Sequence, residues 1–554
     1  MLWQLVVVAL VLMGVHYRWR RRAIYRLHAA LAADLPCNPL VGHATMLIGS
    51  DEDRMKAFQL FGRIALQRGG LTAAWMLNRL YVVIADATAA GVVTRRCLDK
   101  DEATMGFIRT LLGNGSIFAP VEIWRPRRKT LAPVFAVRRV AAFVGLFDRH
   151  AAAAVEQLRA HAGKGDFSLW DTLSAYTFDA VCETSLGVQF RSQGGTPHPF
   201  LRAFAGAQRE LARRMCAPWL YPDVVYRALP PYRRFVRSRR YIHTFIDEII
   251  REKQKEMSIS ESKESSSSDA DSGHKSFLEL MLESGEYSSL ELREEVMVLV
   301  MAGSDTTAVG AAFALLLLAA HPAVQRRARQ ELVEVLGDGS GAMTAASLAR
   351  LKYLEAVVRE ALRLYPPVPV TVREVREPLQ LSCGLVLPAG VGVLLNTWAT
   401  HRSPAYWGAD AELFRPERFL QPLRHPAQFM PFGHSTRNCL GSQYAMLAMK
   451  TVLARTLLQL RVLPATDTPA AAVTAAADTN HADAATYHAD AATKHAAADT
   501  NNADAGTNNA AADTNDAAAD TTAPADDTSP PLRVKFDIAM KHVDNYMVRM
   551  ELLE

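Results

Sequence analysis

Cys439 is the residue of this sequence best suited to chemistry. It lies in the glycine-containing loop of residues 431–441, which precedes a long apolar helical pattern that starts near Gln443. A thiolate at the N-terminus of a helix is stabilised by unpaired backbone N–H groups and by the helix dipole, which makes it a durable metal ligand. Arg437 adds positive charge beside it. The loop alone leaves one alternative open, an ordinary buried thiol, because free cysteine is a common core residue.

A second chemical candidate interrupts the longest apolar stretch of the chain. Asp305 and Thr306 lie in AGSDTT (residues 302–307), within a stretch from about residue 290 to 321 that suits one long buried helix. A carboxylate is costly to bury unless it is paired or used, so this acid requires a reason. The structural alternative is a threonine bonded to the carbonyls of its own helix.

Two further pairs have the spacing of one helical face. Glu360 and Arg363 are three residues apart in a helical pattern that Pro366 ends, so they can form an ion pair. Trp124 and Arg128 are four residues apart, and a guanidinium group suits a carboxylate ligand. Both spacings also occur on ordinary solvated helices. We expect the basic neighbours of the second pair at the surface, namely Arg125, Arg127 and Lys129.

In this order along the chain, the four segments resemble the cytochrome P450 family. Phe432, Arg437, Cys439 and Gly441 match its haem-binding loop. Ser435 stands where the family has a glycine, and a non-glycine residue resists positive φ. The resemblance covers nearly all of the chain and implies haem b with iron bound axially by Cys439. Thiolate ligation favours oxygen cleavage over oxygen carriage.

The same resemblance assigns roles to the other segments. It implies that Asp305 and Thr306 supply protons to oxygen and that Gly303 leaves room for it. Glu360 and Arg363 would meet Arg418 in a buried network that braces the haem. The haem propionates would be bound by four residues, with the last two as further candidates: Trp124, Arg128, Arg373 and Arg437.

The elements that must position these residues are mostly helical. Helical periodicity dominates, with patterns at 323–336, 353–364 and 443–460, while strand-like runs are short, as at 71–85 and 391–396. The fold class is therefore mainly α with a small β region, and the resemblance makes this the cytochrome P450 fold with an N-terminal membrane anchor. Six widely spread cysteines without a CxxC pair exclude a zinc ribbon and a disulfide scaffold, and indicate a reduced, cytosol-facing domain.

Composition divides the chain into four parts. We expect a transmembrane signal anchor at residues 1–17, a basic and proline-containing linker at 18–45, one haem domain at 46–465 plus 532–554, and a disordered insertion at 466–531. A shorter charged and serine-rich stretch, 253–274, predicts a surface loop. Strand-like sequence at 532–538 and 546–552 predicts a final hairpin.

The N-terminus predicts membrane attachment. Residues 1–17 are apolar and reach the short end of the roughly 17 to 25 residues that span a bilayer, and an arginine cluster follows them. A cleaved secretory signal carries its positive charge before the apolar run, which argues against that alternative. The positive-inside rule places the haem domain in the cytosol. We predict the endoplasmic reticulum membrane, with a plastid membrane as the alternative.

The insertion consists of seven-residue units rich in Ala, Asp, Thr and Asn. A coiled-coil seam needs apolar residues larger than alanine, so the composition favours disorder. Residues 466–531 contain eleven aspartates and one lysine, a net charge of −10, so the rest of the chain carries +15 of the total of +5. This balance suits an anionic membrane face and an acidic electron donor.

The function that the resemblance implies is a haem-thiolate monooxygenase acting with O2 on a small apolar substrate of the lipid, sterol or terpenoid class. NADPH-cytochrome P450 reductase is the expected electron donor, with cytochrome b5 or a ferredoxin as alternatives, and we expect no nucleic-acid partner. Variable segments 106–121 and 200–219 should line the substrate site, where Arg109, Arg213 and Arg214 would suit an acidic end. A haem-thiolate isomerase or dehydratase and a non-catalytic haem sensor remain alternative functions.

The segment 111–115, followed by the segment 124–128, also loosely resembles fatty-acid ω-hydroxylating members of the family. Those members often carry a glutamate at the position of Ala302, through which the haem is attached covalently. Because this chain has alanine there, we expect no covalent haem attachment at that position.

Overall fold

The structure is a computed structural model that describes residues 2–194, 198–264, 275–337, 339, 341–466 and 531–553. The chain divides into two units, Met1–Ala465 with Arg533–Glu554, and Thr466–Leu532. Nearly all of the insertion predicted at 466–531 lies outside the described residues.

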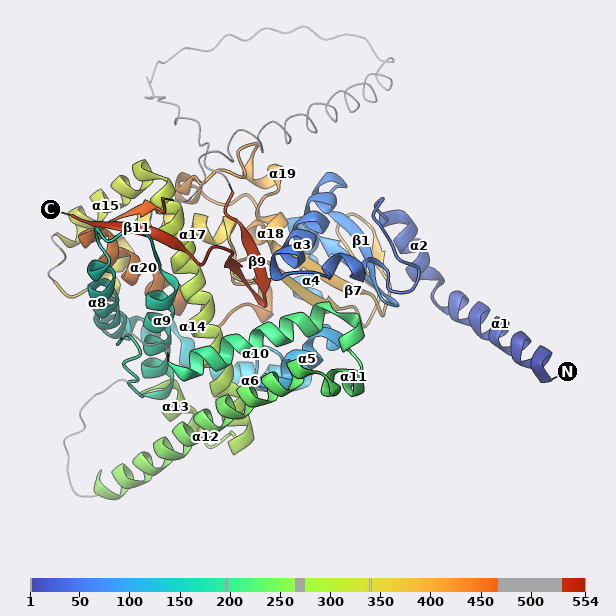
Figure 1. The fold of residues 1–554 in the computed structure, drawn as a ribbon, viewed down its shortest axis with the longest axis horizontal. Coiled ribbons are helices and arrows are strands. Elements are labelled where there is room, and N and C mark those ends of the chain that lie inside the picture. The colour runs from blue at the N-terminus through green and yellow to red at the C-terminus, as the bar shows by residue number, and fades with distance from the viewer. Residues whose placement is uncertain are drawn as a thin grey trace, which may run out of the picture. The chain divides into compact units, whose positions relative to one another are not determined.

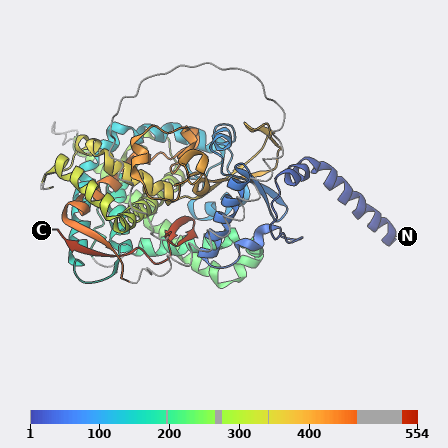
Figure 2. The same ribbon diagram turned by 90° about the horizontal axis from the view of Figure 1, so that it is seen from above.

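The first unit is mainly helical, which confirms the predicted fold class (Figures 1 and 2). Each of the three predicted helical patterns, 323–336, 353–364 and 443–460, is found as a helix. The helices up to the middle of the chain are α1 (Leu2–Arg20), α2 (Arg22–Leu31), α3 (Asp51–Gln67), α4 (Ala87–Arg96), α5 (Glu102–Leu112), α6 (Val121–Leu131), α7 (Val137–Ala142), α8 (Val144–Ala160), α9 (Trp170–Leu186), α10 (Pro199–Cys216), α11 (Asp223–Ala228), α12 (Pro230–Glu264) and α13 (Phe277–Ser284). Those that follow are α14 (Ser289–Ala320), α15 (Pro322–Leu336), α16 (Ala345–Arg350), α17 (Lys352–Leu364), α18 (Thr397–Thr400), α19 (Pro404–Trp407) and α20 (Ser442–Gln459).

The β region consists of small sheets. In the largest, β1 (Leu71–Met76) pairs antiparallel with β2 (Arg79–Ile84), β2 pairs parallel with β7 (Gly392–Asn396), and β7 pairs antiparallel with β4 (Val370–Glu374). The central strand β11 (Met547–Leu552) of a second sheet joins β3 (Phe167–Ser168) and β8 (Leu460–Pro464). Two hairpins remain, β5 (Leu379–Gln380) with β6 (Val386–Leu387), and β9 (Val534–Asp537) with β10 (Ala539–His542).

Two predictions at the level of elements were wrong. The segments 532–538 and 546–552 do not pair with each other, because β9 turns back at once onto β10, and β11 completes a different sheet. The predicted loop at 253–274 is helical up to Glu264, since α12 continues through its first charged residues. Residues 265–274 lie outside the described residues.

The long helix α14 forms the centre of the core. A capping box between Ser288 and Glu291 starts it, and it ends at Ala320, two residues before Pro322. It packs against α9, α17 and α20. Of the helices within the described ranges, α14 alone is long and apolar enough to cross a membrane, but 78% of its most apolar window is buried inside the protein. It is therefore a core helix.

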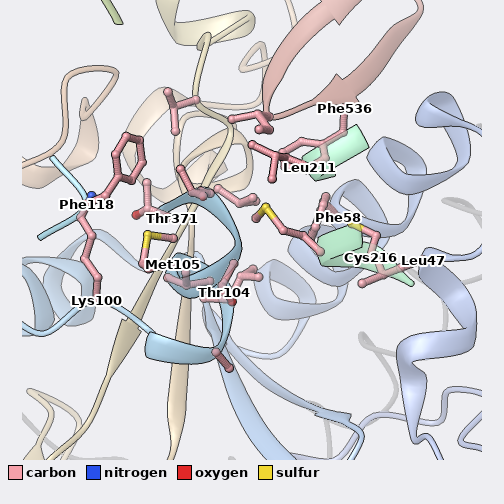
Figure 3. A pocket seen from close by; sticks show the side chains of 18 of the residues that line it. Leu47, Phe58, Lys100, Thr104, Met105, Phe118, Leu211, Cys216, Thr371 and Phe536 are labelled. Carbon is pink, nitrogen blue, oxygen red and sulfur yellow. The ribbon is translucent and has the colours of Figure 1, made fainter. Parts of the chain in front are cut away.

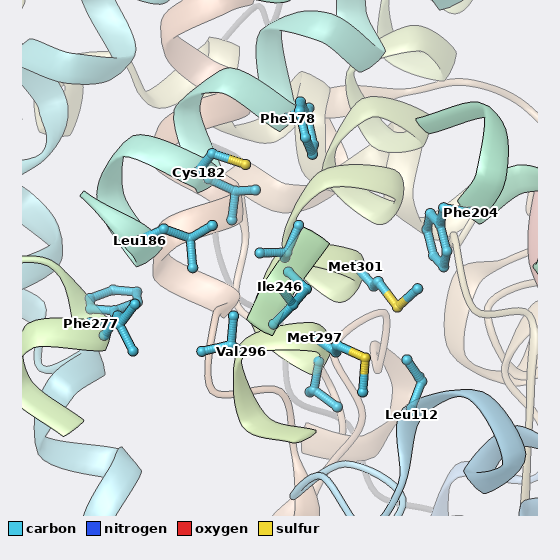
Figure 4. Close-up of a cluster of buried hydrophobic side chains, with 14 of the residues drawn as sticks. Leu112, Phe178, Cys182, Leu186, Phe204, Ile246, Phe277, Val296, Met297 and Met301 are labelled. Atoms are coloured by element: carbon cyan, nitrogen blue, oxygen red, sulfur yellow. The ribbon is translucent and has the colours of Figure 1, made fainter. Parts of the chain in front are cut away.

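The apolar side chains around α14 come from many helices. Figure 4 shows Met297 and Met301 of α14 among Phe178 of α9, Phe204 of α10 and other buried residues of α5, α12 and α13. By contrast, the apolar side chains of α1 are exposed along the helix, from Trp3 at 76% to Trp19 at 60%. No membrane is part of the structure, and the anchor remains a prediction.

Candidate functional site

The loop before α20 folds tightly around Cys439. The Cys439 N–H donates to the carbonyl of Phe432 at 2.8 Å, and Gly433 takes a φ of 72°. Ser435 starts a short 3₁₀ turn with a φ of 63°. The serine thus adopts the left-handed conformation that a glycine would take freely, at a cost of roughly 1 to 2 kcal/mol for an L-residue. The serine therefore strains the turn.

The Cys439 thiol lines a cavity of about 290 Å³, here called cavity 2. The sulfur is exposed to this hollow but is otherwise surrounded by protein. Burial raises the pKa of the Cys439 thiol, although the backbone N–H of Gly441 and the charge of Arg128 oppose the shift. The thiolate stabilisation expected from the helix terminus is thus outweighed by burial, and a bound metal ion would supply the missing positive charge.

Positive charge gathers on one wall of cavity 2. Arg373 is 6% exposed, and its Nε has no hydrogen-bond partner within the described ranges. Arg437 donates to the carbonyls of Leu98 and Ala119, at 2.8 and 2.7 Å, and lies 4.5 Å from the Trp124 ring centre. Burial and the charge of Arg373 lower the pKa of Arg437 to about 10. Among the residues that the structure describes, both arginines donate to backbone carbonyls and neither forms an ion pair with a carboxylate.

Two more cations complete this wall. Arg128 donates two hydrogen bonds of 2.6 Å to Asn438, one to its carbonyl and one to its side chain. Lys100 lines the cavity too, and burial together with the charges of Arg373 and Arg437 lowers its pKa strongly. Sequence reasoning missed Lys100, because the run Asp99-Lys100-Asp101 looks like a solvated charge cluster. Only the tertiary fold brings it to the arginines.

This arrangement fits a haem. Unpaired cations packed together are unfavourable unless an anion joins them, and haem carries two propionates. A sulfur ligand faces the same hollow as the cations. Phe432 and the buried Trp124 contribute apolar surface for a flat macrocycle. The residues named from the sequence as cofactor-binding therefore meet in one place, and Lys100 joins them.

The helix α14 also lines cavity 2, through Gly303 and Thr306. A Cβ atom at Gly303 would lie 2.7 Å from Cγ2 of Val181, so this glycine lets α14 approach α9 closely. That contact explains the glycine by packing alone, and its role toward oxygen stays a prediction. The Thr306 hydroxyl donates to the Ala302 carbonyl at 2.6 Å, as the structural alternative has it.

Asp305 lies in a different environment from Thr306. It lines a larger cavity of about 600 Å³, here called cavity 1, and not cavity 2. Its carboxylate is bound by Lys541 at 3.0 Å and by Gln208 at 3.4 Å. Neither partner could be predicted from the sequence, because both belong to segments far away in the chain. Both predicted proton donors line cavity 1, but of the two only Thr306 also lines cavity 2, and among the described residues no hydrogen bond joins their side chains.

Cavity 1 has a mostly apolar lining (Figure 3). Both predicted variable segments contribute to it, for example through Ile108 and Leu111 of one and Phe204 and Leu211 of the other. The predicted arginines do not line it. Arg109 pairs with Glu102, and Arg214 pairs with Asp223. The expectation of an acidic substrate end held by these side chains is therefore wrong.

The two cavities adjoin each other. Eight residues line both cavities: Lys100, Ile117, Val298, Ala302, Thr306, Val368, Thr371 and Arg373. A molecule bound in cavity 1 can therefore extend toward the cavity that Cys439 lines.

The predicted buried network is present. Arg363 donates from two nitrogens to the two carboxylate oxygens of Glu360, both at 2.7 Å, and both side chains are fully buried. Arg418 approaches Glu360 at 3.4 Å. Arg363 also donates to the carbonyls of His401 and Ala411. The network therefore ties α17 to the segment that leads to the cysteine loop.

One surface prediction near Trp124 was wrong. Arg125 and Lys129 are exposed as expected, but Arg127 is buried and lies 3.1 Å from both Glu294 and Glu295 of α14. Burial raises the pKa of Glu295, and Arg127 opposes this shift. Arg127 therefore joins α6 to α14.

Comparison with known proteins places these features in a family. A family model described as Cytochrome P450 matches residues 35–475. The chain is 30% identical over 465 residues to cytochrome P450 4d2 of Drosophila melanogaster, which covers 81% of this chain and 91% of that protein. It is 32% identical over 367 residues to cytochrome P450 4V2 of Mus musculus, covering 64% and 70%. The human protein of the same name is 30% identical over 429 residues, covering 75% and 81%.

Proposed function

The chain belongs to the cytochrome P450 family of haem-thiolate monooxygenases, and on that premise we propose that it hydroxylates an apolar organic molecule of the lipid, sterol or terpenoid class. The net reaction consumes the substrate, O2, two electrons and two protons, and yields the hydroxylated product and water. NADPH-cytochrome P450 reductase is the proposed electron donor, with cytochrome b5 or a ferredoxin as alternatives.

The observation that carries the proposal is the joint placement of sulfur and positive charge around cavity 2. Cys439 would hold the iron, and the cations would hold the propionates: Arg128, Lys100, Arg373 and Arg437. When bound, the haem supplies the activation of oxygen, with electron density from the thiolate. Together these side chains would hold the cofactor in cavity 2.

Cavity 1 would bind the substrate. Its apolar lining excludes water, and its junction with cavity 2 at Ala302 directs one part of the substrate toward the reacting centre. Thr306 lies at this junction, where its hydroxyl would pass protons, and Asp305, the preceding residue of α14, would be the acid that supplies them.

We further propose that the protein is attached to the endoplasmic reticulum membrane with its haem domain in the cytosol, and a plastid membrane is the alternative. The exposed apolar side chains of α1 and the basic residues at its end, Arg18 and Arg20, support this proposal.

The test is spectroscopic. The reduced protein should bind carbon monoxide and show the Soret band typical of thiolate-ligated haem, and Cys439→Ser should abolish that band. Titration with lauric acid, cholesterol and a monoterpene should shift the spin state of the haem with one class of compound. If haem with an unchanged spectrum survives in Cys439→Ser, the proposed ligation is refuted.

Turnover separates the alternative functions. Product formed only with O2 and NADPH supports a monooxygenase. Product formed without either would indicate an isomerase or dehydratase, and no turnover with any compound that shifts the spin state would indicate a haem sensor.

A further inference from the structure

The C-terminal hairpin of β9 and β10 holds the acid of the proposed proton path. Lys541 of β10 places its Nζ 3.0 Å from Oδ1 of Asp305 on α14, and both side chains are 9% exposed. Gln208 of α10 reaches the other carboxylate oxygen at 3.4 Å. The ammonium of Lys541 also lies 4.9 Å from the centre of the Trp170 ring. Two segments that are distant in sequence from α14 therefore orient this carboxylate.

In this orientation Asp305 faces cavity 1 and has no hydrogen bond to Thr306 among the contacts of the described residues. The Thr306 hydroxyl donates to its own helix instead. A carboxylate that is bound by an ammonium and an amide is not free to relay protons to that hydroxyl. The ion pair must therefore open before Asp305 can act.

The same hairpin forms part of the wall of the substrate cavity. Phe536, Ile538 and Ala539 line cavity 1, and Figure 3 shows Phe536 among the lining side chains. Ile538 makes the turn between the strands with a φ of 61°, a strained conformation for a β-branched residue. A substrate that presses on this turn acts on the hairpin at its most strained residue.

A second acid is available to Lys541 on the hairpin itself. In the register of the two strands Asp537 pairs with Ala539, and Lys535 pairs with Lys541. Because side chains alternate along a strand, Asp537 and Lys541 are diagonal neighbours on one face. Oδ1 of Asp537 is buried and has no hydrogen-bond partner within the described part of the chain. Burial raises the pKa of Asp537, and the nearby charge of Lys541 opposes the shift.

We propose that Lys541 is a positioning residue that exchanges between Asp305 and Asp537, and that substrate in cavity 1 drives the exchange by displacing the hairpin. The inference rests on the proposed function, in which Asp305 is the acid. While Lys541 holds Asp305, O2 takes two electrons and two protons and leaves as hydrogen peroxide. When Asp305 is free, it passes on the protons with which the O–O bond breaks: with two electrons from the reductase and two protons, one oxygen atom leaves as water and the other enters the hydroxylated product. The exchange thus makes cleavage of O2 depend on a bound substrate.

The first test measures how much of the oxidised NADPH yields hydrogen peroxide and how much yields water. It uses the full-length, haem-loaded enzyme with NADPH and its reductase but without substrate. The NADPH consumed in excess of the hydrogen peroxide formed gives the water fraction. This fraction reflects full reduction of O2, with four electrons and four protons, to two molecules of water. Lys541→Met should raise the water fraction several-fold, whereas Lys541→Arg should stay close to wild type. Lys535→Met removes the same charge from the opposite strand and should have no effect. Equal fractions in Lys541→Met and wild type would overturn the inference.

The second test uses thermal unfolding and needs no turnover. In Asp305→Asn and in Asp537→Asn, Lys541 keeps one acid, so each Tm should fall modestly. The double variant strands a buried ammonium, and its Tm should fall by more than the sum of the two losses. Adding Lys541→Met to the double variant should recover part of that loss. Additive losses without recovery would show that Lys541 does not exchange.

Two controls separate this inference from the proposed function. If the reduced carbon monoxide complex of the wild type lacks the thiolate-type band, the proposed function fails whatever the Tm values show. If that band is present and Asp305→Asn lowers kcat by about a hundredfold, while Lys541→Met matches wild type in both tests, only the role of Lys541 fails.

Discussion

Ser435 lies in a loop that holds it in a strained backbone conformation. Its φ of 63° lies in the region that glycine adopts freely, and the loop still directs the Cys439 N–H to the Phe432 carbonyl. The hydrogen bonds and packing of the loop therefore outweigh the strain of one L-residue. The sequence identifies the departure, but only the structure shows that the turn absorbs it.

Ser435→Gly should therefore stabilise the protein. Removing the Cβ should relieve roughly 1 kcal/mol of strain, reduced by the greater chain entropy of glycine in the unfolded state. Thermal unfolding of the haem-loaded protein measures the effect as an increase in Tm. Gly433→Ala, at a neighbouring position with a φ of 72°, should lower the Tm. A lower Tm for Ser435→Gly would show that the serine side chain makes a stabilising contact.

His401 makes stability depend on pH. It is fully buried, accepts a hydrogen bond from the Met430 N–H at 2.8 Å, and burial lowers its pKa to about 3. Because its pKa in the unfolded chain is near 6.5, the unfolded state binds the proton more readily between pH 6.5 and 3. The free energy of unfolding should thus be unaffected by His401 above pH 6.5, and fall below it by up to about 1.4 kcal/mol per pH unit. Urea titrations at pH 7.5 and 5 test this, and His401→Gln should show a smaller difference between them.

At the level of elements, a buried ion pair fixes the position of α17. Glu360 and Arg363 are fully buried and bonded through two nitrogens, and Arg363 also reaches the chain carbonyls beyond α18. Such a pair contributes little net stability over an apolar pair, but removing one partner leaves an uncompensated buried charge. Its effect is to fix the relative position of α17 and the segment before the cysteine loop.

Arg363→Met should consequently destabilise the protein by about 3 to 5 kcal/mol, because Glu360 would lose its cation. Denaturant unfolding measures the loss, and haem content should fall with it. Arg327→Met is a matched control, since Arg327 pairs with Glu417 at the surface, where the two side chains are 53% and 39% exposed, and surface pairs contribute about 0 to 1 kcal/mol. Equal losses in the two variants would contradict the importance of burial.

The elements also show which features could be predicted from sequence. The Glu360–Arg363 pair and the cysteine loop follow from spacing within one short segment, so periodicity and turn residues suffice. Lys100 and Lys541 could not be found in this way, since their partners lie on segments far along the chain. Arg127 was placed wrongly for the same reason: its burial depends on Glu294 and Glu295 of α14, not on its own helix.

At the scale of the whole molecule, the fold class could be predicted because helical periodicity is strong over long segments. Pairing of short strands could not, since β9, β10 and β11 are all short and their sequences do not specify a partner. The apolar composition of α14 resembles that of a membrane helix, and only its burial against α9 and α20 shows that it belongs to the core.

Removal of residues 2–20 should release the protein from membranes, because α1 exposes its large apolar side chains. After fractionation of expressing cells, the shortened chain should move from the membrane pellet to the soluble fraction. Its reduced carbon monoxide spectrum should be unchanged, since the residues around cavity 2 all belong to later segments. A shortened chain that stays in the pellet would indicate another membrane contact.

The last 22 residues, 533–554, return to the first unit after the long insertion. Strand β11 pairs with β8 over five residue pairs, and Lys541 binds Asp305. The ring centres of Phe536 and of Phe58 on α3 are 5.0 Å apart. A protease cut between β8 and β9 would therefore give two polypeptides that migrate separately in denaturing gels yet copurify as one red protein. The enzyme could equally be produced as two separate chains that assemble with each other, the smaller one bringing a wall of the substrate site.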